Sequence, residues 1–153
     1  MQSPLKNWRK IKRGYSFGEK TFYSAHHLGT DYIVSKGTPV FAPCKCKITR
    51  SGVFPQGGKT IHAVFSVRGY GQIVMRCMHL EKMSPVGEYK AGDMLGLTGN
   101  TGKLTTGPHL HIDLSRGSVN LKDFENFLDP DKFFSKIRIR SAARVPAGKN
   151  KKA

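Results

Sequence analysis

The chain has few acidic residues, few cysteines and no long apolar runs. It contains 10 Asp and Glu against 26 Lys and Arg in 153 residues, a formal net charge of +16. No apolar run approaches the roughly 20 residues that a membrane-spanning helix needs. Cys44 and Cys46 are too close in sequence to pair within a strand, and Cys77 is remote from both, so we expect free thiols. These absences predict one soluble domain, too short for a (β/α)₈ barrel of about 250 residues.

Basic residues gather at both ends of the chain. They lie between Lys6 and Arg13, and again after Asp131, which is the last acidic residue. Because such segments have little to bury, we predict three regions: a basic N-terminal segment at 1–14, a folded domain at 15–135, and a basic, disordered tail at 136–153. The first ten residues also lack the apolar stretch of about 7–15 residues of a secretory signal, so we expect synthesis in the cytoplasm without a leader.

The middle of the chain has the pattern of a mostly β protein. Glycine and proline interrupt it every several residues, and β-branched or aromatic runs lie between them. We predict strands at 60–67, 72–80 and 109–115. In the last of these, Leu110, Ile112 and Leu114 alternate with polar side chains, so one face is expected to be core and the other to carry chemistry.

Helical spacing occurs only near the C-terminus. Residues 120–128 carry a capping pattern followed by apolar residues at helical spacing, which predicts a short helix. Asp129 followed by Pro130 predicts the start of a second one.

Four of the six histidines, namely His27, His79, His109 and His111, lie in short motifs whose residue types suit zinc. His27 and Asp31 are four residues apart, and His109 and His111 are two apart. Imidazole nitrogen and carboxylate oxygen are ordinary zinc ligands, and a catalytic site uses three protein ligands. Two histidines two apart share one face of a strand, so one could bind the metal while the other faces the substrate. Spacing alone leaves open which of the two is the ligand.

Three blocks, taken together, resemble the lysostaphin-type zinc endopeptidases of bacterial cell walls. The resemblance covers about residues 17–134, and its blocks are His27-Leu28-Gly29-Thr30-Asp31, Met78-His79-Leu80, and Gly99-Asn100-Thr101-Gly102 followed by Gly107-Pro108-His109-Leu110-His111. It implies that His27, Asp31 and His111 hold one Zn²⁺ and that His79 and His109 are the unligated catalytic pair. It also implies a single-domain, mostly antiparallel β-sheet with a substrate groove and short C-terminal helices.

The function implied by this resemblance is zinc-dependent hydrolysis of stem or cross-bridge peptides in peptidoglycan. Zinc would activate the attacking water, and histidine would act as general acid and base. Without a leader, such an enzyme is expected to be a lytic phage enzyme that a holin releases or a virion delivers; a bacterial enzyme whose leader has been removed is the alternative. We expect a monomer. Both glycine cross-bridges and D-Ala-diaminopimelate bridges remain open as substrates.

Some positions depart from the family pattern. Cys77 occupies a place that is usually aromatic, and strand alternation predicts that it shares a face with His79; if it lines the groove, the enzyme is expected to be thiol-reactive. Tyr23 is the nearest candidate for a tyrosine that assists the oxyanion, but its spacing matches poorly, so that role stays open. Asp113 either orients an imidazole or is an ordinary solvated carboxylate. His26 and His62 fall outside the pattern and are expected to be structural or exposed.

The positive charge permits other interpretations. A charge of +16 attracts peptidoglycan and anionic envelope polymers, but also nucleic acid. The basic tail at 136–153 is expected to bind the envelope polymers; a tail that only keeps the protein in solution is the alternative. A nucleic-acid-binding module is disfavoured, because the middle of the chain lacks interleaved basic and aromatic residues. A catalytically silent binding or regulatory relative is the other alternative, although all five site positions are filled. A D-Ala-D-Ala-type peptidase does not fit, since its acid follows the first histidine at a longer spacing.

Overall fold

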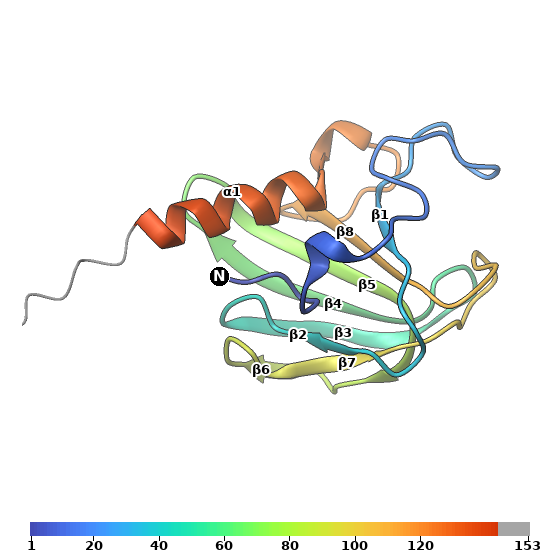
Figure 1. Cartoon of the computed structure of the whole chain (residues 1–153), viewed down its shortest axis with the longest axis horizontal. Helices are drawn as coiled ribbons and strands as arrows, with labels where there is room; N and C mark the ends of the chain where they lie inside the picture. The colour runs from blue at the N-terminus through green and yellow to red at the C-terminus, as the bar shows by residue number, and fades with distance from the viewer. Residues whose placement is uncertain (144–153) are drawn as a thin grey trace, which may run out of the picture.

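The computed structural model describes residues 1–143 and is built on one antiparallel β-sheet of nine strands (Figure 1). The strand order is β1-β8-β5-β4-β3-β6, while β2 pairs with β7, β7 with β5, and β9 with β8. The strands are β1 (Gly29–Tyr32), β2 (Pro39–Phe41), β3 (Cys46–Phe54), β4 (Gly58–Val67), β5 (Gly71–Met83), β6 (Gly87–Tyr89), β7 (Met94–Thr98), β8 (Leu110–Arg116) and β9 (Phe127–Leu128). The predicted fold class is confirmed.

The three strands predicted from alternation are all present as β4, β5 and β8. Ile61 and Phe65 of β4 and Ile112 of β8 are buried in one hydrophobic cluster, as the pattern of every second residue requires. That cluster lies on one face of the sheet, so the opposite face is left for polar side chains.

A second layer covers the apolar face. It consists of the 3₁₀ helix η1 (Trp8–Lys10) and the helix α1 (Pro130–Ala143), which lies across the sheet in Figure 1. Phe133 and Phe134 of α1 are buried in the same cluster as Trp8, and the Phe133 ring centroid is 6.5 Å from that of Phe65 on β4. The predicted helix start is confirmed, because α1 begins at Pro130 and the Asp129 carboxylate accepts a hydrogen bond from the Asp131 backbone N–H at 2.9 Å.

Both expected flanks are more structured than the sequence indicates. Leu5 and Trp8, from the segment expected to flank the domain, are buried, and Arg13 forms an ion pair with Asp131 at 3.0 Å. The expected boundary between residues 135 and 136 falls inside α1, so the expectation of a disordered tail is wrong for residues 136–143. The helix continues because Ile137 adds another buried apolar side chain. Residues 144–153 of the expected tail lie outside the described residues.

The helix predicted over residues 120–128 is wrong. The segment forms only the 3₁₀ turn η2 (Phe124–Asn126), and then Phe127 and Leu128 pair with Ser115 and Leu114 as strand β9. Hydrogen bonding to the edge of the sheet outweighs the local helical spacing. No helix within residues 1–143 has the length and apolar character needed to cross a membrane.

Candidate active site

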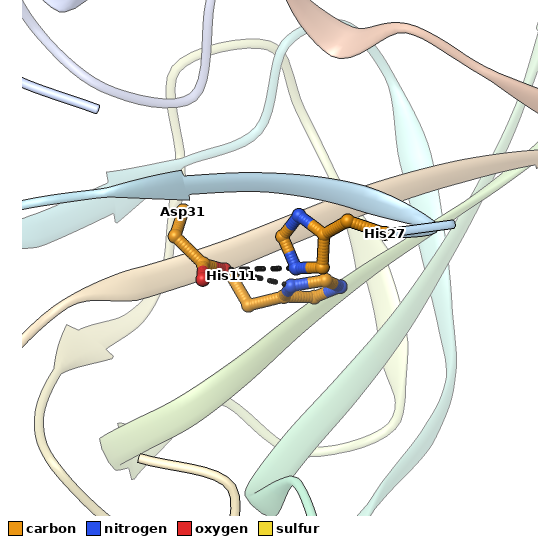
Figure 2. Close-up of side chains that lie close together, drawn as sticks. All are labelled: His27, Asp31 and His111. Atoms are coloured by element: carbon orange, nitrogen blue, oxygen red, sulfur yellow. Dashed lines mark hydrogen bonds and ion pairs between the residues drawn. The ribbon is translucent and has the colours of Figure 1, made fainter. Parts of the chain in front are cut away.

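Three side chains, two from paired strands and one from the segment just before β1, meet at one point (Figure 2). Asp31 on β1 lies directly opposite His111 on β8 in the antiparallel register, and His27 lies just before β1. Asp31 Oδ1 is 2.9 Å from His111 Nδ1 and 3.4 Å from His27 Nε2. One potential ligand atom from each residue lies within 4.8 Å of the others, and all three residues are buried. The strand pairing therefore brings together the residues predicted as metal ligands.

In His27 and His111, the ring nitrogen that points away from the cluster forms a hydrogen bond, and this determines which nitrogen faces the cluster. His27 Nδ1 is 3.3 Å from the Ser16 carbonyl oxygen, and His111 Nε2 is 2.9 Å from Asp113 Oδ2. Since carbonyl and carboxylate oxygens only accept, both of these nitrogens donate, and His27 Nε2 and His111 Nδ1 are left with lone pairs in the neutral rings. His27 Nε2 is buried without a hydrogen-bond partner among the described residues. Two nitrogen lone pairs and a carboxylate oxygen form a donor set that fits zinc.

The electrostatics of the cluster favour a positive charge at the same point. Burial opposes ionisation of Asp31, but the hydrogen bond with His111 and the close contact with His27 hold its pKa well below the ordinary value. Burial likewise opposes protonation of His111, but hydrogen bonds with Asp113 and Asp31 raise its pKa to about 9. His111 would lose that proton on holding a metal ion, because a histidine ligand must be deprotonated at the coordinating nitrogen.

His79 and His109 lie beside this cluster with their ring centroids 4.6 Å apart. His79 Nδ1 donates to the Thr101 carbonyl oxygen at 2.7 Å, and His109 Nδ1 to that of Gly107 at 2.8 Å. Nε2 therefore remains available on both rings, and that of His109 is 3.8 Å from Asp31 Oδ1. Burial lowers the pKa of His79 to about 4, so at neutral pH this ring is uncharged and able to accept a proton.

The backbone at His79 breaks the alternation of β5. His79 adopts a left-handed conformation with φ 64°, and the β4–β5 register shifts between Lys59 and Ile61. This irregularity directs the His79 ring to the groove while Cys77 is fully buried in the hydrophobic cluster. The expectation that Cys77 shares the face of His79 is therefore wrong; Cys77 does not line the groove, and burial raises the pKa of its thiol far above the usual range.

The cluster lies in a groove with two arms. One arm, of about 680 Å³, is lined by His27, His79 and His111 together with side chains of β3, β4 and β5. The other arm, of about 550 Å³, is lined by Asp31 and His109. Such a groove can hold an extended peptide across the metal ligands.

Tyr23 lines both arms of the groove. Burial, reinforced by the negative charge of Asp31, raises the pKa of Tyr23 to about 12, so its hydroxyl stays protonated at neutral pH. The side chain is thus a neutral hydroxyl at the centre of the groove.

Behind His111 lies a buried ion pair that the sequence did not reveal. Arg76 Nε and Nη2 donate to Asp113 at 2.8 and 2.6 Å, and Asp113 also accepts from His111. Asp113 is fully buried, so the reading of it as a solvated aspartate is wrong; it contacts and orients an imidazole. Burial opposes its ionisation, but the charge of Arg76 lowers the pKa of Asp113. Arg76 could be found only from the β5–β8 register, which pairs it with Asp113.

The two histidines outside the motif contribute differently. His26 is exposed and stacks on Phe124 with ring centroids 4.8 Å apart. His62 is half-buried on β4 and lines the larger arm of the groove. Neither belongs to the group of possible metal ligands found in the described part of the chain.

A cluster of two imidazoles and one carboxylate on a β-sheet, with two further histidines beside it in a groove, defines a metal-dependent hydrolase site. Residues 25–123 match peptidase family M23, and the chain belongs to this family of zinc metallopeptidases. The matching segment contains His27, Asp31, His79, His109 and His111.

Known proteins of similar sequence and structure agree with this assignment. The chain is 36% identical over 105 residues to lysostaphin of Staphylococcus simulans, covering 66% of this chain and 21% of lysostaphin. It is 36% identical over 93 residues to the peptidoglycan DD-endopeptidase ShyA of Vibrio cholerae, covering 59% and 20%. The catalytic domain of lysostaphin from S. simulans superposes with a TM-score of 0.73 at 28% identity, covering 88% of this chain and 99% of that domain. The chain thus spans about a fifth of the length of these curated relatives.

Proposed function

We propose that this chain is a zinc-dependent endopeptidase that hydrolyses peptide bonds in the stem or cross-bridge peptides of peptidoglycan. The observation that carries the proposal is the convergence of His27, Asp31 and His111 on one point, with the free Nε2 atoms of His79 and His109 beside it. The similarity to lysostaphin and to a peptidoglycan DD-endopeptidase supports the substrate class.

In this proposal His27 Nε2, Asp31 Oδ1 and His111 Nδ1 hold the zinc. When bound, zinc supplies Lewis acidity that polarises the scissile carbonyl and lowers the pKa of water. Asp113 keeps Nδ1 of His111 directed at the site by accepting the proton on Nε2. Ser16 does the same for His27 through its carbonyl oxygen.

His79 and His109 move the protons of the reaction. Each ring is fixed by a hydrogen bond from Nδ1 to a backbone carbonyl oxygen, so Nε2 is the atom that exchanges a proton. One of the pair accepts a proton from the attacking water, and a proton then passes to the leaving amine. General acid–base catalysis of this kind contributes about 10²–10⁴-fold to the rate.

The finer parts of the proposal concern where the enzyme acts. We propose an endolysin-like, bacteriolytic role as a monomer on the cell wall, and attraction to anionic envelope polymers by the net charge of +16. The catalytic domain that superposes on this chain is described as that of an antimicrobial peptidase, which supports a lytic role. The part of the basic tail beyond residue 143 lies outside the described residues.

Metal analysis of alanine variants tests the ligand assignment. His27→Ala, Asp31→Ala and His111→Ala are each expected to lose stoichiometric zinc, because three ligands are the minimum of a catalytic site. His26→Ala is the matched control, since it removes the adjacent histidine that lies outside the cluster. Retention of one zinc per chain in all three variants would contradict the assignment.

Hydrolysis of purified sacculi tests the catalytic pair. His79→Ala and His109→Ala are expected to keep zinc while the rate of fragment release, followed by mass spectrometry, falls by orders of magnitude. Near-normal turnover would refute their role. A wild-type protein that binds zinc but releases no fragments from sacculi of several bacterial types would instead be a catalytically silent relative.

A further inference from the structure

A row of polar side chains leads away from the metal cluster across four neighbouring strands. The registers place Arg50 of β3 opposite His62 of β4, His62 opposite Arg76 of β5, and Arg76 opposite Asp113 of β8. Side chains at directly paired positions project from the same face of a sheet. All four residues line the larger arm of the groove, with the metal cluster at its other end. The arm therefore has a continuous polar floor from Asp113 to Arg50.

The charges on this floor do not balance. Asp113 is the only acidic residue lining this arm among the described residues, and it is already shared between Arg76 and His111. Arg50 is exposed, and no carboxylate in residues 1–143 lies within ion-pair distance of it. The Arg50 guanidinium is thus an uncompensated positive charge in the groove.

Aromatic packing holds that charge in place. The Arg50 guanidinium carbon lies 5.0 Å from the centroid of the Phe54 ring, and Phe54 stacks on His62 at 6.3 Å between ring centroids. Stacking on an aromatic face restrains the guanidinium and leaves its edge available for hydrogen bonds. Burial, and after it the charges of Arg76 and Arg50, lower the pKa of His62.

We propose that Arg50, with His62 beside it, forms a subsite for a free carboxylate of the peptide substrate. This proposal rests on the peptidase function proposed above and narrows its substrate class. A guanidinium binds a carboxylate through two parallel hydrogen bonds, a geometry that neutral peptide groups cannot match. The subsite favours stem-type peptides that carry free carboxylates within the chain over a glycine bridge, which carries none.

The strand spacing indicates where that carboxylate lies. Three strand intervals of about 4.8 Å, or about 14 Å in all, separate β3, which carries Arg50, from β8, which carries the metal-site residue His111. An extended peptide advances about 3.3–3.6 Å per residue, so the carboxylate belongs within about four residues of the cleaved bond. Within residues 1–143, no Lys or Arg lines the other arm of the groove, so the preference applies to one side of that bond only.

Amidated peptides test the subsite. Cross-linked stem peptides would be prepared with one free carboxylate at a time converted to a carboxamide, and kcat/KM of the zinc-loaded full chain measured by chromatography of the products. We expect one amidation, on one side of the cleaved bond, to lower kcat/KM about tenfold, the range of a charge-assisted hydrogen bond. Arg50→Gln should bring the ratio of kcat/KM for the acid and amide peptides close to one. Arg68→Gln is the matched control, because Arg68 is an exposed arginine in the β4–β5 turn outside the groove, and it should leave the ratio unchanged.

Two results would overturn the subsite while leaving the peptidase function intact. They are equal cleavage of every acid and amide pair by the wild-type chain, and an undiminished acid preference in Arg50→Gln. Failure of the zinc-loaded wild-type chain to cleave any of these peptides, or sacculi, would overturn the peptidase function and the subsite with it.

Discussion

The buried pair of Arg76 and Asp113 should affect folding and zinc binding separately, and a pair of substitutions can distinguish the two effects. Asp113 accepts two hydrogen bonds from Arg76 and one from His111, and it is fully buried. Arg76→Met leaves the Asp113 carboxylate buried without its counter-charge. Asp113→Leu leaves the Arg76 guanidinium unpaired and also removes the acceptor for His111. The double variant replaces the whole ion pair with apolar groups.

The expected magnitudes follow from burial. Removing one partner of a buried ion pair costs about 3–5 kcal/mol, because the remaining charge is uncompensated, whereas replacing both partners is often nearly neutral. We therefore expect each single variant to lose about 3–5 kcal/mol in the free energy of unfolding of the metal-free protein, and the double variant to recover most of that loss. Zinc affinity should behave differently, since loss of a hydrogen bond to a ligating histidine costs about 10–100-fold. The double variant should thus be stable but bind zinc weakly.

Two measurements check this. Urea unfolding in the presence of a chelator reports stability, and competition with a chromophoric zinc chelator reports affinity. Arg76→Met alone should lose less zinc affinity than the double variant, because Asp113 still accepts the proton of His111. A double variant that binds zinc as tightly as the wild type would refute the positioning role of Asp113. Additive stability losses in the double variant would refute the argument from burial.

Further predictions concern other close contacts. Gly29→Ala should strongly destabilise the chain and weaken zinc binding, because the new Cβ would lie 2.1 Å from a carbonyl oxygen of β8. Chemical denaturation measures the loss of stability. Gly52→Ala is the control, because it also lies in a strand but its Cβ would meet only ring carbons at 3.7 Å or more. Tyr32→Phe removes the 2.7 Å hydrogen bond to Asp131 and should cost about 1–2 kcal/mol of unfolding free energy. Burial and Asp131 raise the pKa of Tyr32 above its ordinary value of 10.0. The wild type should therefore exceed Tyr32→Phe in unfolding free energy by the full amount below pH 10, and the difference should shrink above pH 10. A difference that stays constant across that range in urea unfolding would disprove the linkage. Cys77 should not react with a thiol reagent in the folded, zinc-bound protein, and loss of activity on its modification under native conditions would contradict its burial.

The sequence was sufficient to predict the features that depend on residues close together in the chain. Strict alternation located β4, β5 and β8, because a half-buried strand must present every second residue to the core. Asp129 and Pro130 located the start of α1. The site residues came from a resemblance between motifs, since spacing alone did not distinguish His109 from His111 as the ligand. In each of these cases the information is local or is carried by a motif.

The features that escaped prediction all depend on long-range pairing. Arg76 is 37 residues from Asp113, and only the β5–β8 register shows that they meet. The alternation of side chains along a regular strand cannot predict the left-handed backbone at His79, so the prediction placed Cys77 on the same face as His79. Phe127 is in a strand because β8 offers it a partner, although its local spacing is helical. In these cases tertiary contacts override a local preference.

The four histidines of the site share one structural arrangement that explains how a small sheet can hold them in a fixed geometry. Each uses one ring nitrogen for a hydrogen bond to an acceptor oxygen, and in three of them that acceptor is a backbone carbonyl. The fourth, His111, uses Asp113, which Arg76 holds from the neighbouring strand. Since every outer nitrogen is engaged, the ring orientations are determined before a metal or substrate binds. Gly29 and the apolar face of β8 also contribute to this fixed geometry, because they keep β1 close enough to β8 for Asp31 to contact His111.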